Sequence, residues 1–290
     1  MSVETFIPAL WAADLLESLR DEHRYGNCVN RDYQGEIKGM GSSVVINTPG
    51  PVTVRNYSRN TALATPDTLV MADQILTIDQ GKYFRTMIDN VDKVQARADL
   101  RAAFMREAAD AIADTMDDFI SALINTAVDG TANDLTNGTP LTVGQGAGEI
   151  DMYGLLVKMG KVLDESNTPK NGRWIVVPAF AEAQTRLDNR FVGFGTTPSQ
   201  SRAFSGKPIA EAAGFTLYMS NRTPAGGSSS KVILGGYKGA VTFAEQIEEM
   251  RAFQHPDYFA EVMQELHVYG GKVTRPSNIV AAEVLEGEYY

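Results

Sequence analysis

The 290-residue sequence contains a single cysteine and only three histidines, which leaves little material for several kinds of chemistry. One cysteine, Cys28, excludes an intramolecular disulfide and a cysteine-based zinc cluster. The histidines, His23, His255 and His267, do not fall into a metal-binding spacing such as HExxH. Asp257 stands close to His255, but the proline between them favours a turn. The sequence therefore predicts no metal, no cofactor and no catalytic site.

Basic clusters and long apolar runs are missing as well. The 26 basic and 36 acidic residues give a net charge of −10, and no run of five basic residues occurs. Because phosphate binding requires clustered Lys and Arg, we do not expect the whole surface to bind nucleic acid. The first residues, MSVETFIPALWAADLL, lack the features of a secretory signal, and no apolar run reaches membrane-spanning length. We expect a soluble chain in a reducing compartment.

One stretch is free of glycine and proline over an unusual length, residues 92–128. Strong helix formers dominate it, and apolar residues recur at steps of mostly three or four. Asp92 and Gln95 have the spacing of a capping box, and Gly130 follows the last turn. The pattern predicts a helix on the order of 55 Å long. The residues expected on its core face are Ile112, Met116, Phe119 and Leu123.

Strand patterns precede this helix. SSVVIN and VTVRNY flank a Pro-Gly-Pro bend, and LVMADQILTID and KYFRTMID follow a polar tract at residues 58–68. They predict an extended hairpin over residues 42–89. Since two-stranded ribbons are marginal alone, we expect this one to reach another chain, although an ordinary surface hairpin is the alternative. The residues predicted to contact that chain are Arg55, Tyr57, Arg59, Leu63 and Thr68.

The second half of the chain alternates helices and strands. Residues 151–166 predict a helix with an apolar inner face, and residues 174–177 predict a buried strand followed by a helix starting at Pro178. A glycine- and serine-rich loop is expected at residues 191–206. Strands are predicted in GFTLYMSN and VILGG, and three more follow residue 240. The fold class is therefore α+β.

Five segments carry a resemblance to a known family. They are FIPALWAADLLESL, LTIDQGKYFRTMIDNVDKVQARADL, RWIVVPAF, GFTLYMSNRTP and HVYGGKVTRP, and in this order they resemble the major capsid protein of tailed bacteriophages. The resemblance implies the tailed-phage capsid fold. Its parts would be an N-terminal arm (1–41), an extended loop with its strand roots (42–91), a spine helix in a peripheral domain (92–128), an axial domain (129–239) and closing strands of the peripheral domain (240–290).

The resemblance also implies a function and partners. The chain would assemble with itself as pentamers and hexamers into an icosahedral shell around double-stranded DNA, without sequence-specific DNA binding and without a membrane. Its location would be the virion, after assembly in the host cytoplasm. A portal at one vertex is implied, a separate scaffolding protein is expected because the arm is short, and a decoration protein is left undecided. Two alternatives remain: an encapsulin-like compartment with the same fold, and a soluble enzyme with an acidic cleft on the axial domain.

Overall fold

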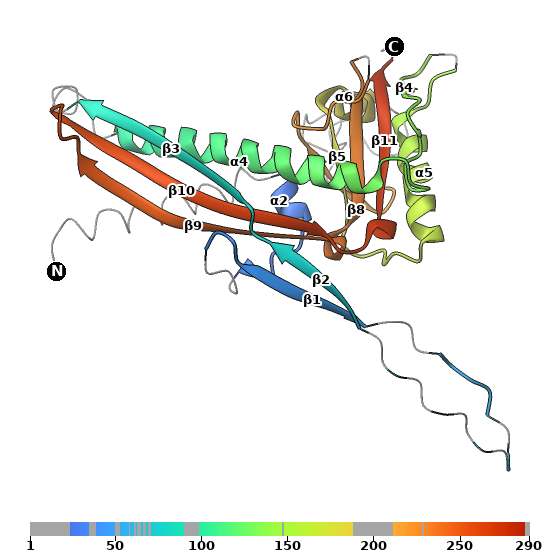
Figure 1. Ribbon diagram of the computed structural model, residues 1–290. Helices are drawn as coiled ribbons and strands as arrows, with labels where there is room; N and C mark the ends of the chain where they lie inside the picture. Colours follow the sequence, from blue (N-terminus) through green and yellow to red (C-terminus); the bar gives the residue numbers. More distant parts are fainter. Residues whose placement is uncertain are drawn as a thin grey trace.

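The computed structural model describes residues 24–34, 39–49, 53–57, 59–60, 62, 65, 68, 71–89, 99–146, 148–187, 211–227 and 229–287. A long helix and a long three-stranded sheet make up one part of the molecule, and a six-stranded sheet with helices makes up the other (Figure 1). The predicted loop at residues 191–206 and the capping pair Asp92 and Gln95 lie outside the described residues. No described helix combines the length and apolar character needed to cross a membrane.

The long helix is α4, Asp99–Val128, and it ends where Gly130 was expected to end it. Its most buried residues are Ala109, Ala113, Met116, Ile120, Ile124 and Val128. Of the predicted core residues, Met116 is fully buried, whereas Ile112, Phe119 and Leu123 are partly buried at the edges of this stripe. Among the described side chains of its N-terminal half, Ala108, Ala109 and Ala113 are buried and pack with Met263 of the long sheet.

The long sheet has the order β3-β10-β9 and is antiparallel throughout. Its strands are β3 (Gln80–Asp89), β9 (Val241–Gln254) and β10 (Ala260–Val273). Figure 1 shows α4 running along this sheet. The segment KYFRTMID was predicted as an arm of the extended hairpin, and this is wrong: it is β3, which pairs with β10 from Gln80↔Tyr269 to Asp89↔Ala260. A ladder of that length satisfies the backbone of β3 better than a two-stranded ribbon would.

The root of the hairpin is a ribbon of β1 (Ser43–Pro49) and β2 (Met71–Thr77). Of the expected strand VTVRNY, the described residues 53–57 form no strand. One face of the ribbon packs against β9 and β10 of the same chain, in a cluster of Val44, Ile46, Leu76, Ile78, Ala244 and Val268. This face of the root therefore belongs to the subunit's own core, whereas the ribbon was expected to find its packing partner in another chain.

The six-stranded sheet has the order β4-β11-β8-β5-β7-β6. Its strands are β4 (Leu141–Val143), β5 (Arg173–Val177), β6 (Glu211–Ala212), β7 (Phe215–Met219), β8 (Lys231–Tyr237) and β11 (Ile279–Glu286). Strand β11 was assigned to the peripheral domain with β9 and β10, but it lies between β4 and β8. Its run of buried residues suits a central strand that is covered on both faces.

Two helices accompany this sheet, α5 (Met152–Glu165) and α6 (Ala179–Leu187). Asp151 caps α5, since its carboxylate accepts a hydrogen bond from the Gly154 backbone N–H. The predicted inner face of α5 packs on the sheet, with Leu155, Leu156, Met159 and Leu163 fully buried. Short helical turns, α2 (Tyr25–Cys28), η3 (Lys238–Ala240) and η4 (Pro276–Asn278), complete the described fold.

Two consecutive glycines in β10, Gly270 and Gly271, allow the β1–β2 ribbon and α4 to approach opposite faces of this strand closely. A Cβ on Gly270 would lie 2.2 Å from the Thr77 carbonyl oxygen. A Cβ on Gly271 would lie 2.8 Å from Leu123 Cδ2 on α4. The pair therefore has the ribbon on one side and α4 on the other, and a side chain at Gly270 would push the ribbon away from β10.

Candidate inter-subunit surfaces and the junction beside them

The hairpin carries the residues predicted to contact another chain. Arg55, Tyr57, Arg59 and Thr68 are all exposed, and Leu63 lies outside the described residues. Tyr57 is 76% exposed, and the neighbouring Val54, which the sequence prediction did not single out, is 93% exposed. Apolar side chains this accessible on a projecting segment are typical of an interaction surface. That these residues contact a neighbour stays a prediction.

The outer face of the ribbon adds a second apolar patch. Val45 and Ile75 are register partners across the two strands, and they are 52% and 54% exposed. The opposite face of the ribbon is buried against the long sheet. A cross-strand apolar pair of this kind is left for something outside the subunit to cover. Sequence reasoning missed it because only the pairing register places the two residues opposite each other.

The turn between β9 and β10 exposes two aromatic residues at the far end of the long sheet. Tyr258 is 64% exposed and Phe259 is 89% exposed. His255 belongs to this turn, as predicted from the following proline: its Nδ1 accepts the Asp257 backbone N–H at 3.1 Å. The imidazole therefore has a structural role in the turn, and the aromatic pair is a further candidate contact surface.

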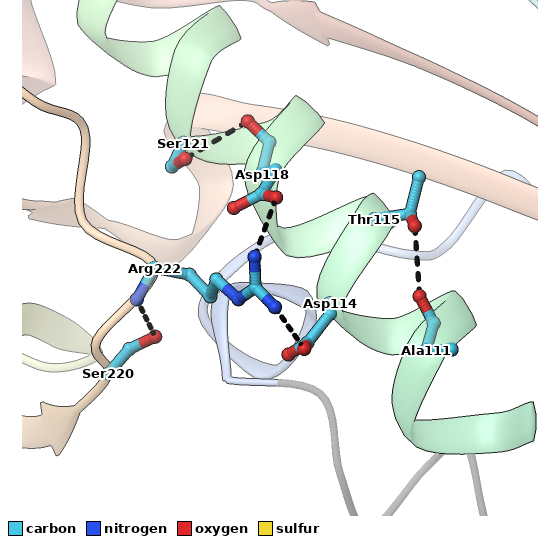
Figure 2. A network of polar contacts seen from close by, with 7 residues as sticks. All are labelled: Ala111, Asp114, Thr115, Asp118, Ser121, Ser220 and Arg222. Carbon is cyan, nitrogen blue, oxygen red and sulfur yellow. Dashed lines mark hydrogen bonds and ion pairs between the residues drawn. The ribbon is translucent and has the colours of Figure 1, made fainter. Parts of the chain in front are cut away.

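A charged junction links α4 to the six-stranded sheet (Figure 2). Arg222, shortly after β7, donates to the carboxylates of Asp114 and Asp118, which lie one turn apart on α4. Its backbone N–H donates to Ser220 Oγ at 3.1 Å, which fixes the loop. The hydrogen bond with Asp114 raises the pKa of Arg222 above its usual range. The three side chains are about half exposed, and exposed ion pairs contribute little to stability. The main effect of the junction is therefore to fix the orientation of the six-stranded sheet relative to α4.

The first described residues are attached to the same helix through Asp117. Asp117 is 3% exposed, and its carboxylate accepts the backbone N–H groups of Arg24, at 2.8 Å, and Gly26, at 3.3 Å. Tyr25 and Cys28 then enter the core beside Met116. Burial raises the pKa of the Cys28 thiol, so this free cysteine is an unreactive core residue. Helix α4 therefore contacts both the N-terminal segment at residues 24–26 and the loop that follows β7.

An enzyme with an acidic cleft finds little support among the described residues. Within the described ranges, no group of three His, Cys, Asp or Glu side chains could hold a metal ion. A cavity of about 580 Å³ lies along α5, and its walls carry Lys161, Lys170 and Arg173 beside Asp164 and Glu165. Arg173 and Asp164 form an ion pair at 2.7 Å, and this hydrogen bond lowers the pKa of Asp164. The walls are of mixed charge, which does not fit the acidic cleft considered for an enzyme.

Comparison with known proteins finds similarity to phage capsid proteins. The family described as Phage capsid protein matches residues 75–282. A structure from Mycobacterium phage Che8 is similar with a TM-score of 0.68 and 25% identity, covering 90% of each chain. The capsid of cyanophage P-SCSP1u is similar with a TM-score of 0.61 and 17% identity, covering 87% of this chain and 85% of the other.

The capsid of Ralstonia phage GP4 shows the same fold at lower identity. Its TM-score is 0.60 at 12% identity, and the similarity covers 90% of this chain and 88% of the other. No curated protein sequence matches the chain.

Proposed function

This chain belongs to the phage capsid protein family, and from that premise we propose that it assembles as pentamers and hexamers into an icosahedral shell enclosing packaged double-stranded DNA. Membership of the family gives the general role: the chain is a structural, self-associating component of a phage particle. The tailed-phage capsid fold extends over nine tenths of the chain in the comparison with Che8. That coverage is the observation that carries the proposal.

The exposed surfaces support assembly through several moderate contacts. The hairpin presents Val54 and Tyr57, the ribbon presents Val45 and Ile75, and these lie on one projecting element. A shell subunit must bury such patches against neighbours that repeat around a closed surface. We propose that the hairpin, with Arg55 and Arg59, lies across an adjacent copy, so that contacts that are weak individually add up over the shell.

The charge of the chain suits a container for DNA. Its net charge of −10 opposes tight binding of phosphates, which would hinder the packing and release of the genome. We therefore propose enclosure without sequence-specific contacts. Assembly in the host cytoplasm with a separate scaffolding protein, and a portal at one vertex, complete the proposal.

Replacing the tip of the hairpin tests the role of this element. Residues 55–69 are exchanged for a short Gly-Ser turn, which leaves the β1–β2 ladder intact because that ladder ends at Pro49↔Met71. We expect a soluble subunit with nearly unchanged circular dichroism that forms no closed shells when co-expressed with its scaffold. Lys161→Ala, at an exposed position on α5, serves as a control that should assemble normally.

Two outcomes would contradict this role. Normal shells from the truncated variant, seen by electron microscopy, would mean that the hairpin is not needed for closure. A grossly unfolded subunit would mean that the tip belongs to the subunit's own core, together with the ribbon root.

A further inference from the structure

A chain of alternating charges is buried in the long sheet beneath α4. His267 on β10 is 1% exposed and lies between two carboxylates: its Nε2 is 3.6 Å from Glu245 Oε2 on β9, and its Nδ1 is 3.5 Å from Glu265 Oε1 on β10. Arg31, from the segment after α2, continues the chain, with its Nη1 2.9 Å from Glu245 Oε1. When His267 is protonated, the order along these residues is cation, anion, cation, anion. We call these four residues the charged cluster.

The charged cluster separates two apolar regions under the same helix. The far region packs Ala108, Ala109 and Ala113 of α4 against Met263. The near region contains Met116, Ile120, Phe243 and Tyr269 and continues into the six-stranded sheet. Ile112 of α4 packs against both regions, so the charged cluster is a polar inclusion between them and not a complete break in the apolar packing.

The backbone of the sheet is also irregular at this position. The register between β9 and β10 shifts between Leu266 and His267, whereas the register between β3 and β10 continues without a break. A bulge weakens the ladder locally and bends the strand. The charged cluster therefore lies beside a local irregularity of the β9–β10 ladder, while β3 still bridges the near and far parts of the sheet.

A cavity of about 200 Å³ opens onto the cluster, and its size allows ordered water. Glu265 and His267 line it, and both carboxylate oxygens of Glu265 and both ring nitrogens of His267 lack a hydrogen-bond partner among the described residues. The other lining residues are Tyr269 from β10, Lys82, Tyr83 and Phe84 from β3, and Ala108, Ala111, Ile112, Thr115 and Met116 from α4. Lys82 is the one further charged group in this lining, since α4 contributes none.

The protonation state of His267 determines whether the positive and negative charges of the cluster cancel. Burial lowers the pKa of His267, but the carboxylates of Glu245 and Glu265 outweigh that effect, so the pKa lies above its ordinary value. With the imidazole charged, the two acids and the two cations, His267 and Arg31, compensate one another. With the imidazole neutral, an ionised Glu265 would have no cation at the 3.5 Å position that His267 occupies, and an uncompensated buried charge is costly in a low-dielectric interior.

We propose that the charged cluster is a proton-operated switch: the imidazolium of His267 holds the far half of α4 and the long sheet together, and its deprotonation loosens that half while the six-stranded sheet stays folded. A group with a raised folded-state pKa contributes stability that is complete below the unfolded-state value of about 6.5. That contribution is lost as the pH rises through the folded-state pKa. The switch therefore opens on the alkaline side. It concerns the subunit alone and does not depend on shell assembly.

Hydrogen exchange of the purified full-length chain, read by mass spectrometry between pH 6.5 and 9.5, tests this. Rates are corrected for the intrinsic base catalysis of exchange. Peptides from residues 106–115 of α4 and 260–266 of β10 should lose protection by about tenfold for each unit by which the pKa is raised. Peptides from α5 and β5 should keep their protection and serve as the internal reference. A flat corrected profile in the far half, or an equal loss in both regions, would overturn the proposal.

Variants separate the switch from a structural effect. His267→Gln is neutral at every pH, so its far half should exchange rapidly at pH 6.5 and show no further pH dependence. His255→Gln, in the exposed β9–β10 turn, should behave as wild type. Glu265→Gln removes the carboxylate that the imidazolium neutralises, so it should reduce the pH dependence of exchange in the far half. If His267→Gln does not fold, the exchange profiles of Glu265→Gln and of the wild type are sufficient to test the proposal. An unchanged pH profile in either cluster variant would refute the role of His267.

Discussion

Gly270→Ala is expected to be among the most damaging single-methyl additions in this protein. The new Cβ would lie 2.2 Å from the Thr77 carbonyl oxygen and 3.0 Å from the Ile78 Cα, whereas ordinary van der Waals contact begins at 3.4 Å. Both neighbours are backbone atoms, so no side-chain rotation relieves the overlap, and the ribbon must move by about 1 Å. Overpacking of this kind costs about 1–3 kcal/mol, and we expect a loss of about 3 kcal/mol in the free energy of unfolding.

Gly271→Ala is the matched control on the opposite face of β10. Its Cβ would meet Leu123 Cδ2 at 2.8 Å and Phe119 Cε1 at 3.3 Å, and both belong to side chains that can rotate away. We expect a loss of about 1 kcal/mol. Chemical denaturation of the unassembled chain gives both values. Equal losses, or a larger loss for Gly271→Ala, would show that α4 rather than the ribbon is the rigid neighbour of β10 and would refute this account of the glycine pair.

Two further substitutions test α4. Phe119→Ala removes an edge-to-face contact with Tyr269, whose ring centroid is 5.1 Å away, and should lower the free energy of unfolding by about 3 kcal/mol. Arg106→Ala, at an exposed position of the same helix, should cost well under about 1 kcal/mol; equal effects in denaturation curves would mean that the wrong helix face was assigned. Arg222→Met should slightly lower the thermal midpoint at low salt, and the difference should vanish at high salt; a loss independent of salt would contradict an ion-pair junction.

The individual elements could be predicted because their signals are local. Residues 99–128 lack helix breakers and show helical periodicity, and the three strands after residue 240 follow from their own patterns. The pairing of strands could not be predicted in the same way. Strand β3 pairs with β10 across most of the chain, and β11 enters the six-stranded sheet, because an alternating pattern does not specify which partner a strand takes.

The charged cluster escaped prediction for a related reason. In QELHVYGG, alternation places Leu266 and Val268 on a core face and Glu265 and His267 on a solvent face. In the fold both faces of β10 are covered, the first by the ribbon and the second by α4. Burial of the polar face depends on the position of a helix more than a hundred residues away. For the hairpin, the sequence predicted residues that prove to be exposed, but their contacts are still a prediction.

Cryo-electron microscopy of particles formed by the full-length chain with its assembly partners tests the central claim most directly. We expect closed icosahedral shells of pentamers and hexamers around DNA, with the hairpin of each subunit on its neighbour and Val45 and Ile75 covered there. Small discrete oligomers under the same conditions would contradict a shell role, and closed shells filled with protein cargo would contradict the enclosure of DNA.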